Sequence, residues 1–256
     1  MARKIVVTSG KGGVGKTTVA VQLAAQLALK GQRVVVCDAD LGLNNVDVAA
    51  GIEHLITYDL VDVIEGKCRA KQALVKHPDY PNFFVLSSGR SSPERYVSPQ
   101  AIKIVLEGLA PQFDYLLIDC PAGIDEGFHR AVATADEALV ITTPHLTSLR
   151  DADKVLTMLK SYHLKSLSVV VNRVKGELLS AGECLTPQEI SELLKTPLLG
   201  ILPEDQGIYD GDLKRLHPAF QTLAGNLMTG KIKMFDVTKK YGGFFGGLRR
   251  VLKKVL

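Results

Sequence analysis

The chain has 256 residues, of which 46% are apolar and 23% charged, and its formal net charge is +4. A chain of this length and apolar content can bury the core of one α/β domain. The charge is unevenly placed: residues 230–256 hold eight Lys or Arg and one Asp, a sum of +7, so the remaining 23 basic and 26 acidic residues give −3. This distribution argues against a broad nucleic-acid-binding face before residue 230 and indicates a basic tail that meets an anionic partner.

Four cysteines, Cys37, Cys68, Cys120 and Cys184, are scattered without the spacing of a disulfide framework or of a Cys/His metal site. We therefore expect reduced thiols. The first strand pattern begins by Lys4, which leaves no room for a targeting peptide, and no apolar run approaches the roughly 20 residues of a membrane span. The expected location is the cytoplasm.

Residues 9–18 lie between an apolar strand pattern at 5–7 and a helical pattern from 16 to 30 that ends at Gly31. The segment fits G-x-x-x-x-G-K-[ST], the phosphate-binding loop, in the strand–loop–helix context that this motif requires. Its glycines let backbone amides curl around phosphate oxygens, and the helix directs its positive end at the anion. Lys16 is expected to bridge the β- and γ-phosphates, and the Thr17 hydroxyl to ligate Mg²⁺. The nucleotide-binding residues predicted here are Gly10, Lys11, Gly12, Gly13, Val14, Gly15, Lys16, Thr17 and Thr18.

The next apolar run, residues 33–37, predicts a buried strand that leads into Asp38 and Asp40. Carboxylates just beyond the carboxyl end of a strand lie where ligands bind in open α/β sheets. Residues 55–77 predict two short helices, 83–86 a strand, 87–98 a loop, and 98–109 a helix that opens at Ser98-Pro99. Residues 115–119 then read as four apolar positions ending in Asp119, which predicts a Walker B strand whose aspartate holds Mg²⁺ directly or through water.

Three further strands are predicted at 137–143, 167–171 and 198–202, with a helix beginning at Ser148 between the first two. Asn172 follows the second of these strands, and Pro203 and Glu204 follow the third. About seven strands alternating with helices predict an α/β fold with a doubly wound, mostly parallel sheet over residues 1–235.

Residues 244–256 are amphipathic: on a helix their apolar side chains fall within an arc of roughly 140°, and the basic side chains take the other face. Such a pattern is typical of a helix lying in the plane of a membrane interface, and the alternative is a terminal helix docked on the domain. One tail should bind weakly, whereas two tails on a dimer gain roughly 10²–10⁴ in avidity. We expect residues 236–256 to form a flexible linker and a membrane-targeting helix. The residues predicted to contact the membrane are Phe244, Phe245, Leu248, Arg249, Arg250, Val251, Leu252, Lys253, Lys254 and Val255.

Lys11 and Lys16 together, in K-G-G-V-G-K-T-T, resemble the deviant Walker A loop of the MinD/ParA class of P-loop ATPases. The stretches D-A-D-L-G-L-N-N at 38–45, D-C-P-A-G-I at 119–124 and L-R-D-A-D at 149–153 occur in that family's order, so the resemblance covers essentially the whole chain. It implies that Lys11 reaches across a dimer interface to the other subunit's ATP. It also implies that Asp40 orients the attacking water and joins Thr17 and Asp119 at the metal, and that Asp38 lies near the metal and the γ-phosphate.

The same resemblance implies that residues 120–124 form a switch whose Gly123 approaches the γ-phosphate, and that Asn172 contacts the adenine near Pro203 and Glu204. Arg150, Asp151 and Asp153 would lie near the dimer and partner surface. The implied function is a Mg²⁺- and ATP-dependent dimer that binds the cytoplasmic face of the inner membrane reversibly. It would control the position of the division septum by recruiting a division inhibitor. A topological partner would stimulate hydrolysis or otherwise localise the protein, and hydrolysis would be slow without that partner. No specific nucleic-acid partner is expected.

Four alternatives stay open. A DNA-segregation ATPase of the ParA type would favour a basic patch on the body of the protein, against the −3 found before residue 230. A flagellar-number regulator of the same class would share the tail but usually carries an extension before the loop. An electron carrier like nitrogenase reductase uses two cysteines per subunit to bridge a cluster, and Cys120 is the one residue here that suggests such a role. A non-catalytic scaffold would bind ATP only to dimerise, and Asp40 discriminates this reading from an enzyme.

Overall fold

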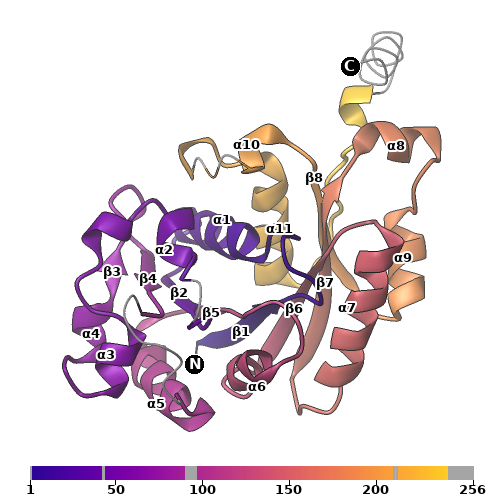
Figure 1. Ribbon diagram of the computed structural model, residues 1–256. Helices are drawn as coiled ribbons and strands as arrows, with labels where there is room; N and C mark the ends of the chain where they lie inside the picture. The colour runs from indigo at the N-terminus through magenta and orange to yellow at the C-terminus, as the bar shows by residue number, and fades with distance from the viewer. Residues whose placement is uncertain (1, 42–43, 90–96, 210, 212, 242–256) are drawn as a thin grey trace.

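A computed structural model describes residues 2–41, 44–89, 97–209, 211 and 213–241. These residues build one eight-stranded sheet in the order β3-β4-β2-β5-β1-β6-β7-β8 (Figure 1). Neighbouring strands are parallel, except that β3 runs antiparallel to β4. The strands are β1 (Arg3–Thr8), β2 (Val34–Asp38), β3 (Val75–Lys76), β4 (Phe83–Leu86), β5 (Tyr115–Asp119), β6 (Glu137–Thr142), β7 (Ser166–Val174) and β8 (Leu198–Pro203).

Helices connect the strands and cover both faces of the sheet. The longer ones are α1 (Lys16–Leu29), α5 (Pro99–Leu109), α6 (Glu126–Val132), α7 (Leu146–Leu159), α8 (Gly176–Ala181), α9 (Pro187–Leu194) and α11 (Pro218–Thr229). The short ones are α2 (Val46–Ala49), α3 (Leu60–Ile64), α4 (Ala70–Ala73) and α10 (Gln206–Tyr209), with single 3₁₀ turns η1 (Glu53–Leu55), η2 (Ala110–Gln112), η3 (Leu213–Arg215) and η4 (Lys239–Tyr241).

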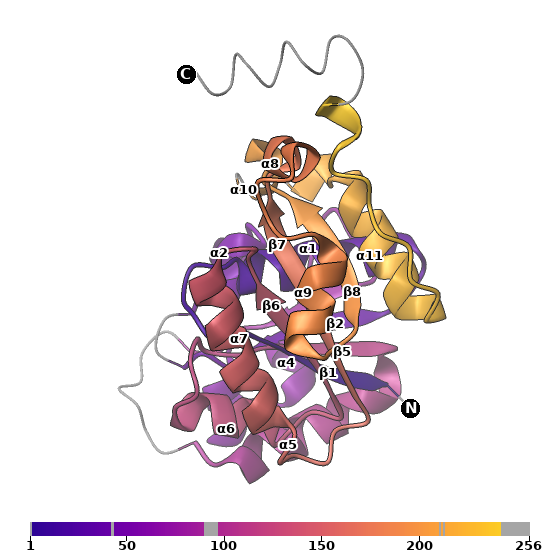
Figure 2. The same cartoon turned by 90° about the vertical axis from the view of Figure 1, so that its right-hand side faces the viewer.

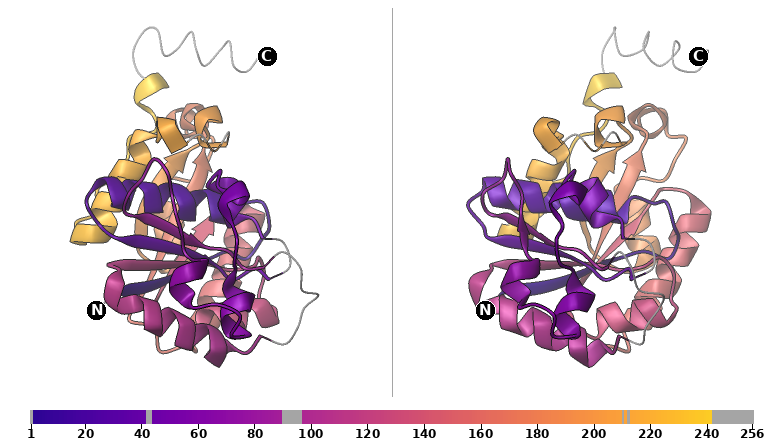
Figure 3. Two further views of the ribbon diagram at one scale, coloured as in Figure 1. Left: turned by 90° about the vertical axis from the view of Figure 1, so that its left-hand side faces the viewer. Right: turned by 60° about the vertical axis from the view of Figure 1, so that its left-hand side comes forward.

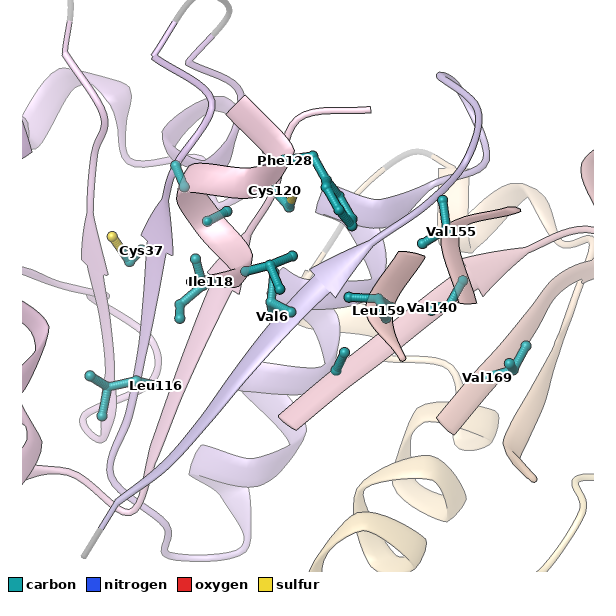
Figure 4. Close-up of a cluster of buried hydrophobic side chains, with 14 of the residues drawn as sticks. Val6, Cys37, Leu116, Ile118, Cys120, Phe128, Val140, Val155, Leu159 and Val169 are labelled. Atoms are coloured by element: carbon teal, nitrogen blue, oxygen red, sulfur yellow. The ribbon is translucent and has the colours of Figure 1, made fainter. Parts of the chain in front are cut away.

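Side chains on successive strand residues enter two separate cores, because they point to opposite faces of the sheet. On β1, Ile5 and Val7 pack under α1 and α11, while Val6 packs on the opposite face. That second core, shown in Figure 4, joins Val6 to Phe128 of α6 and Leu159 of α7. Figures 2 and 3 show the resulting layers, with α1 and α11 on one side of the sheet and α5, α6, α7 and α9 on the other. The doubly wound, mostly parallel sheet is confirmed.

The structure differs from the sequence-based expectations at several short elements. Eight strands replace seven because the two-residue β3 adds an antiparallel edge within residues 55–77. Helix α7 begins at Leu146 rather than at Ser148, and β7 continues through Val174, so Asn172 lies inside the strand and not after it. Register shifts between β7 and β8 let the strand continue past this polar residue.

Residues 230–241, here called the C-terminal strap, run from the end of α11 back toward the carboxyl ends of the strands (Figure 2). Both polar atoms of the buried Asn226 amide hold its start, since Nδ2 donates to the Lys233 carbonyl at 2.7 Å and Oδ1 accepts from the Lys233 amide at 3.0 Å. Val237 is 6% exposed, and a side chain on Gly176 would overlap its carbonyl oxygen. Packed structure thus continues past the domain boundary placed at residue 235 and reaches Tyr241. The predicted membrane residues 244–255 lie outside the described part of the chain.

No helix within the described residues combines the length and the apolar character that crossing a bilayer requires. Their longest helices, α1 and α7, have 14 residues each.

Candidate functional site

The phosphate-binding segment lies between the end of β1 and the start of α1, at the carboxyl ends of the parallel strands. Gly15 has φ +95°, in the left-handed region, and a Cβ there would lie 2.5 Å from Nδ2 of Asn172. A side chain on Gly10 would overlap the backbone carbonyl of Asp151 in α7. Close packing therefore requires both glycines, and the left-handed turn conformation is a second reason for Gly15. The first turn of α1 carries no acidic residue, so no side-chain carboxylate there offsets the positive end of the helix.

Thr17 and Asp119, two of the three residues predicted to hold Mg²⁺, are in direct contact at this edge. The Thr17 hydroxyl donates to Oδ2 of Asp119 at 2.6 Å, although 102 residues separate them in the chain. The other carboxylate oxygen, Oδ1, is buried without a hydrogen-bond partner, and Asp119 as a whole is 3% exposed. Burial raises the pKa of Asp119 to about 6, against the lowering effect of Lys16 and of the Thr17 hydroxyl. A hydroxyl beside an orphaned carboxylate oxygen is a donor set that fits Mg²⁺.

Asp38, beside Asp119 in the register of β2 and β5, has both carboxylate oxygens on backbone amides. It accepts from the amides of Asp40 at 2.9 Å, Asn45 at 3.0 Å and Val46 at 3.2 Å. Burial, and then the charge of Asp119, raise the pKa of Asp38 to about 7. These bonds close the 38–46 loop and cap the start of α2, so Asp38 shapes the segment that carries Asp40.

Lys11, Asp40 and Gly123, three further predicted residues of the phosphate side, lie nearer the surface of the same edge. Lys11 is exposed, with its carbonyl held by the Ser9 hydroxyl at 2.9 Å. Asp40 is half-buried, and its charge helps raise the pKa of Asp119. Gly123 has φ +96°, and its amide donates to the Ser9 carbonyl at 3.1 Å, which joins residues 120–124 to the phosphate-binding segment.

Asn172 braces the phosphate-binding segment from β7. Its Nδ2 donates to the Val14 carbonyl at 2.8 Å, and its Oδ1 is buried without a hydrogen-bond partner. The donor contact fixes which way the amide points, so Oδ1 remains an open acceptor. Pro203 and Glu204 lie at the end of the adjacent strand, where the Glu204 amide donates to the Val174 carbonyl at 3.0 Å.

Sequence reasoning did not single out Arg173, which follows Asn172 in the chain, or Tyr209, which contacts Arg173. Arg173 has φ +58°, which is uncommon outside glycine, and its guanidinium carbon lies 4.8 Å from the centre of the Tyr209 ring. The sequence signal for Arg173 was its position directly after Asn172, a predicted site residue. Tyr209 gave no periodic signal because α10 has only four residues.

The predicted partner residues occupy the first half of α7, beside Gly10. Arg150 and Asp153 are exposed, and Asp151 is paired with Lys154 at 3.3 Å. A protein that contacts this helix would therefore touch the element whose backbone packs directly on the phosphate-binding segment.

The fold and this edge of the sheet define a P-loop nucleotide-binding protein. The family described as an AAA domain matches residues 2–170. The septum site-determining protein MinD of Synechocystis sp. is 38% identical, over 98% of this chain and 99% of that protein. The chain therefore belongs to the MinD family of septum site-determining ATPases.

Solved structures agree with this assignment. A chain of the MinC:MinD cell division protein complex of Aquifex aeolicus superimposes with a TM-score of 0.83 at 35% identity, covering 91% of this chain and 98% of that one. MinD of Pyrococcus horikoshii, complexed with Mg-ADP, superimposes with a TM-score of 0.79 at 30% identity, covering 90% and 97%.

Proposed function

We propose that this protein binds and hydrolyses Mg-ATP at residues 10–18 and uses the ATP-bound state to control placement of the division septum. The observation that carries the nucleotide chemistry is the Thr17–Asp119 contact at 2.6 Å beside an unpartnered, buried Asp119 oxygen. Membership of the MinD family supports the cellular role.

In this proposal, the backbone amides of residues 10–16 and the Lys16 ammonium bind the β- and γ-phosphates. Bound Mg²⁺ would neutralise charge between those phosphates, and Thr17 and Asp119 would supply its protein ligands. Asp40 orients the attacking water, and the amide bonds of Asp38 hold the Asp40 segment in place. The two unlike roles of these neighbouring aspartates follow from their surroundings, because both oxygens of Asp38 already accept backbone hydrogen bonds.

ATP would also drive dimerisation, with the exposed Lys11 reaching the nucleotide of the second subunit. The dimer would recruit a MinC-like division inhibitor through the surface of Arg150, Asp151 and Asp153. Support comes from the match to a chain of a MinC:MinD complex and from the packing of Asp151 on Gly10. A topological factor, MinE-like or a polar scaffold, would stimulate a turnover that is otherwise slow.

Attachment to an anionic membrane would occur through the basic tail at 244–255, with the protein otherwise in the cytoplasm. The experiment that tests this is co-sedimentation with anionic vesicles in ATP, in ADP and without nucleotide. Pelleting in ATP alone is the expected result. Equal pelleting in all three states would make the tail a constitutive anchor, and no pelleting would favour the DNA-segregation alternative.

An Asp40→Ala variant separates the enzyme from the scaffold. We expect it to form ATP-dependent dimers without turnover. A wild-type protein that shows no turnover even with vesicles and partner would favour the non-catalytic scaffold. A flagellar-number regulator, which shares the loop and the tail, is distinguished by failing to bind a MinC-like inhibitor.

A further inference from the structure

The side chain of Asn44 ties the loop that carries Asp40 to two neighbouring elements. Its Oδ1 accepts from the Ser87 hydroxyl at 2.7 Å and from the Ser88 hydroxyl at 3.1 Å. Its Nδ2 donates to Oδ2 of Asp47 at 3.3 Å. Because a carboxylate can only accept, this last contact fixes which way the amide points. These three bonds, from Asn44 to Ser87, Ser88 and Asp47, are called the loop clasp below.

The clasp is anchored on buried groups. Ser87 and Ser88 directly follow β4, the strand that pairs with β2, and both serines are fully buried. The Ser87 carbonyl also accepts from the Leu60 amide at 2.8 Å, where α3 begins. Asp47 is 1% exposed in the first turn of α2. Buried hydroxyls are costly without an acceptor, so the two serines favour a loop conformation that keeps Asn44 beside them.

The backbone of Asn44 has an uncommon conformation. Its φ of +45° lies in the left-handed region, which asparagine enters more readily than most residues with a Cβ. Its amide points back to the Asp40 carbonyl at 3.4 Å. Such conformations persist where surrounding contacts impose them, and they concentrate in switch segments and at active sites. The clasp supplies contacts of this kind.

The clasp and Asp38 hold the same loop from two different strands. Asp38 accepts from the amides of Asp40, Asn45 and Val46, which ties the loop to β2. Asn44 ties it to the end of β4. Holding from both sides matters for a group that orients a reacting water, because a displacement of 1 Å can cost about 100-fold in rate.

We propose that Asn44 is a positioning residue, which fixes the 38–46 loop to the end of β4 so that the Asp40 carboxylate is held in place for hydrolysis. The inference rests on the proposed hydrolysis of Mg-ATP at residues 10–18. It goes beyond that function by giving a role in turnover to a residue that is neither a predicted metal ligand nor part of the phosphate-binding segment.

Four substitutions separate the clasp from the backbone conformation. Asn44→Ala removes the clasp, and Asn44→Gly also removes it while suiting a positive φ. Ser87→Ala removes one donor to the same amide. Asn82→Ala is the matched control, because Asn82 is likewise half-buried and lies at the opposite end of β4, where its backbone carbonyl accepts from the Val34 amide at 2.9 Å. A thermal melt of each variant establishes that it is folded.

The first test compares turnover with affinity. Steady-state phosphate release in the presence of anionic vesicles gives kcat, and equilibrium binding gives the dissociation constant for Mg-ATP. We expect both Asn44 variants to lower kcat by about 10- to 100-fold, because Asp40 is no longer held, and to change Mg-ATP affinity by less than about two-fold. Ser87→Ala should lower kcat by a smaller factor, and Asn82→Ala should change neither quantity.

The second test needs no nucleotide. The amides of Asn45 and Val46 should exchange their hydrogens about ten-fold faster in both Asn44 variants, because the loop opens more often once the clasp is lost. The double variant Asn44→Ala with Ser87→Ala should lose no more kcat than Asn44→Ala alone, since both changes remove the same contact.

A wild-type kcat in Asn44→Gly would overturn the proposal, because asparagine would then be needed only for its backbone conformation. Equal losses of kcat and of Mg-ATP affinity would overturn it too, since they would show general damage to the site, and so would a higher kcat. If Asn44→Ala fails to fold, Asn44→Gly and Ser87→Ala decide by the same comparison. A wild-type protein that binds Mg-ATP without hydrolysing it would refute the proposed enzyme itself, whereas unchanged hydrogen exchange in the Asn44 variants would refute the clasp alone.

Discussion

Replacing Asp119 with asparagine should stabilise the nucleotide-free protein while abolishing its response to Mg-ATP. The Asp119 carboxylate is buried, and its pKa is raised from 3.8 to about 6, chiefly by burial and opposed by Lys16. A raised pKa in an acid means that folding penalises the charged form. The difference of about two pKa units corresponds to about 3 kcal/mol when the group is fully ionised, and to about 1–3 kcal/mol once its coupling to Asp38 is considered.

The upward direction of the Asp119 pKa shift determines the pH range in which the buried charge lowers stability. Above pH 6 the wild-type protein carries the full penalty, and as the pH falls from 6 toward 4 the folded carboxyl takes up its proton first, so the penalty disappears. Asp119→Asn has no such penalty at any pH, and its amide oxygen can still accept from Thr17. We expect the variant to be more stable by about 1–3 kcal/mol at pH 8 and equal to the wild type near pH 4.

Urea unfolding at pH 4, 6 and 8, in chelator and without nucleotide, measures this difference. Adding Mg-ATP at 100 times its dissociation constant should then stabilise the wild type by about 2.7 kcal/mol and leave the variant unchanged. A variant that is less stable than the wild type at pH 8 would refute the reasoning, because it would mean that the buried charge is fully compensated by its neighbours.

Three further predictions follow from the strap and the phosphate-binding segment. Gly176→Ala should loosen the strap, because the added Cβ overlaps a strap carbonyl, and tryptic cleavage within 231–240 should therefore accelerate. Gly108→Ala is the control: its added Cβ would enter open space, so this variant should be cleaved like the wild type. Asn226→Ala removes three hydrogen bonds, one buried and two partly buried, and should lower the free energy of unfolding by about 2–4 kcal/mol in urea titrations. A loss below about 1 kcal/mol would contradict the role of that amide. Lys11→Ala should retain ATP affinity but lose ATP-dependent dimers in light scattering, whereas Lys16→Ala should lose both; dimers of the first variant would exclude the cross-subunit role.

The parts of the fold that the sequence predicted are those whose signal is local. The strand at 115–119 ends at Asp119 as expected, because four apolar residues and one aspartate define it without reference to the rest of the chain. The helix after the phosphate-binding segment ends next to Gly31, whose φ of +83° is the left-handed cap that the sequence indicated. The strand at 83–86 was likewise predicted with its observed bounds.

Elements defined by distant contacts could not be predicted in this way. The two-residue β3 exists only because it pairs with β4, and α10 only because Gln22 and Asp205 hold its four residues. Asn172 was predicted to follow a strand, since polar residues usually end one, but its Nδ2 donates to the Val14 carbonyl across 158 residues of chain. The contacts of Tyr209 arise in the same manner, so its place next to Arg173 emerged only from the structure.

The path of the strap decides where attachments to this protein will stand. Arg3 opens β1 at the amino edge of the sheet, where its guanidinium donates to the Leu227 carbonyl at 2.6 Å. Lys240, by contrast, is paired at 3.3 Å with Asp205, at the carboxyl edge that carries the nucleotide-binding residues. A fluorescent protein or affinity tag fused before residue 1 would thus project from the edge opposite the nucleotide. The last described residues, 239–241, lie against α8 at this second edge, so labels for imaging or immobilisation belong at the N-terminal end.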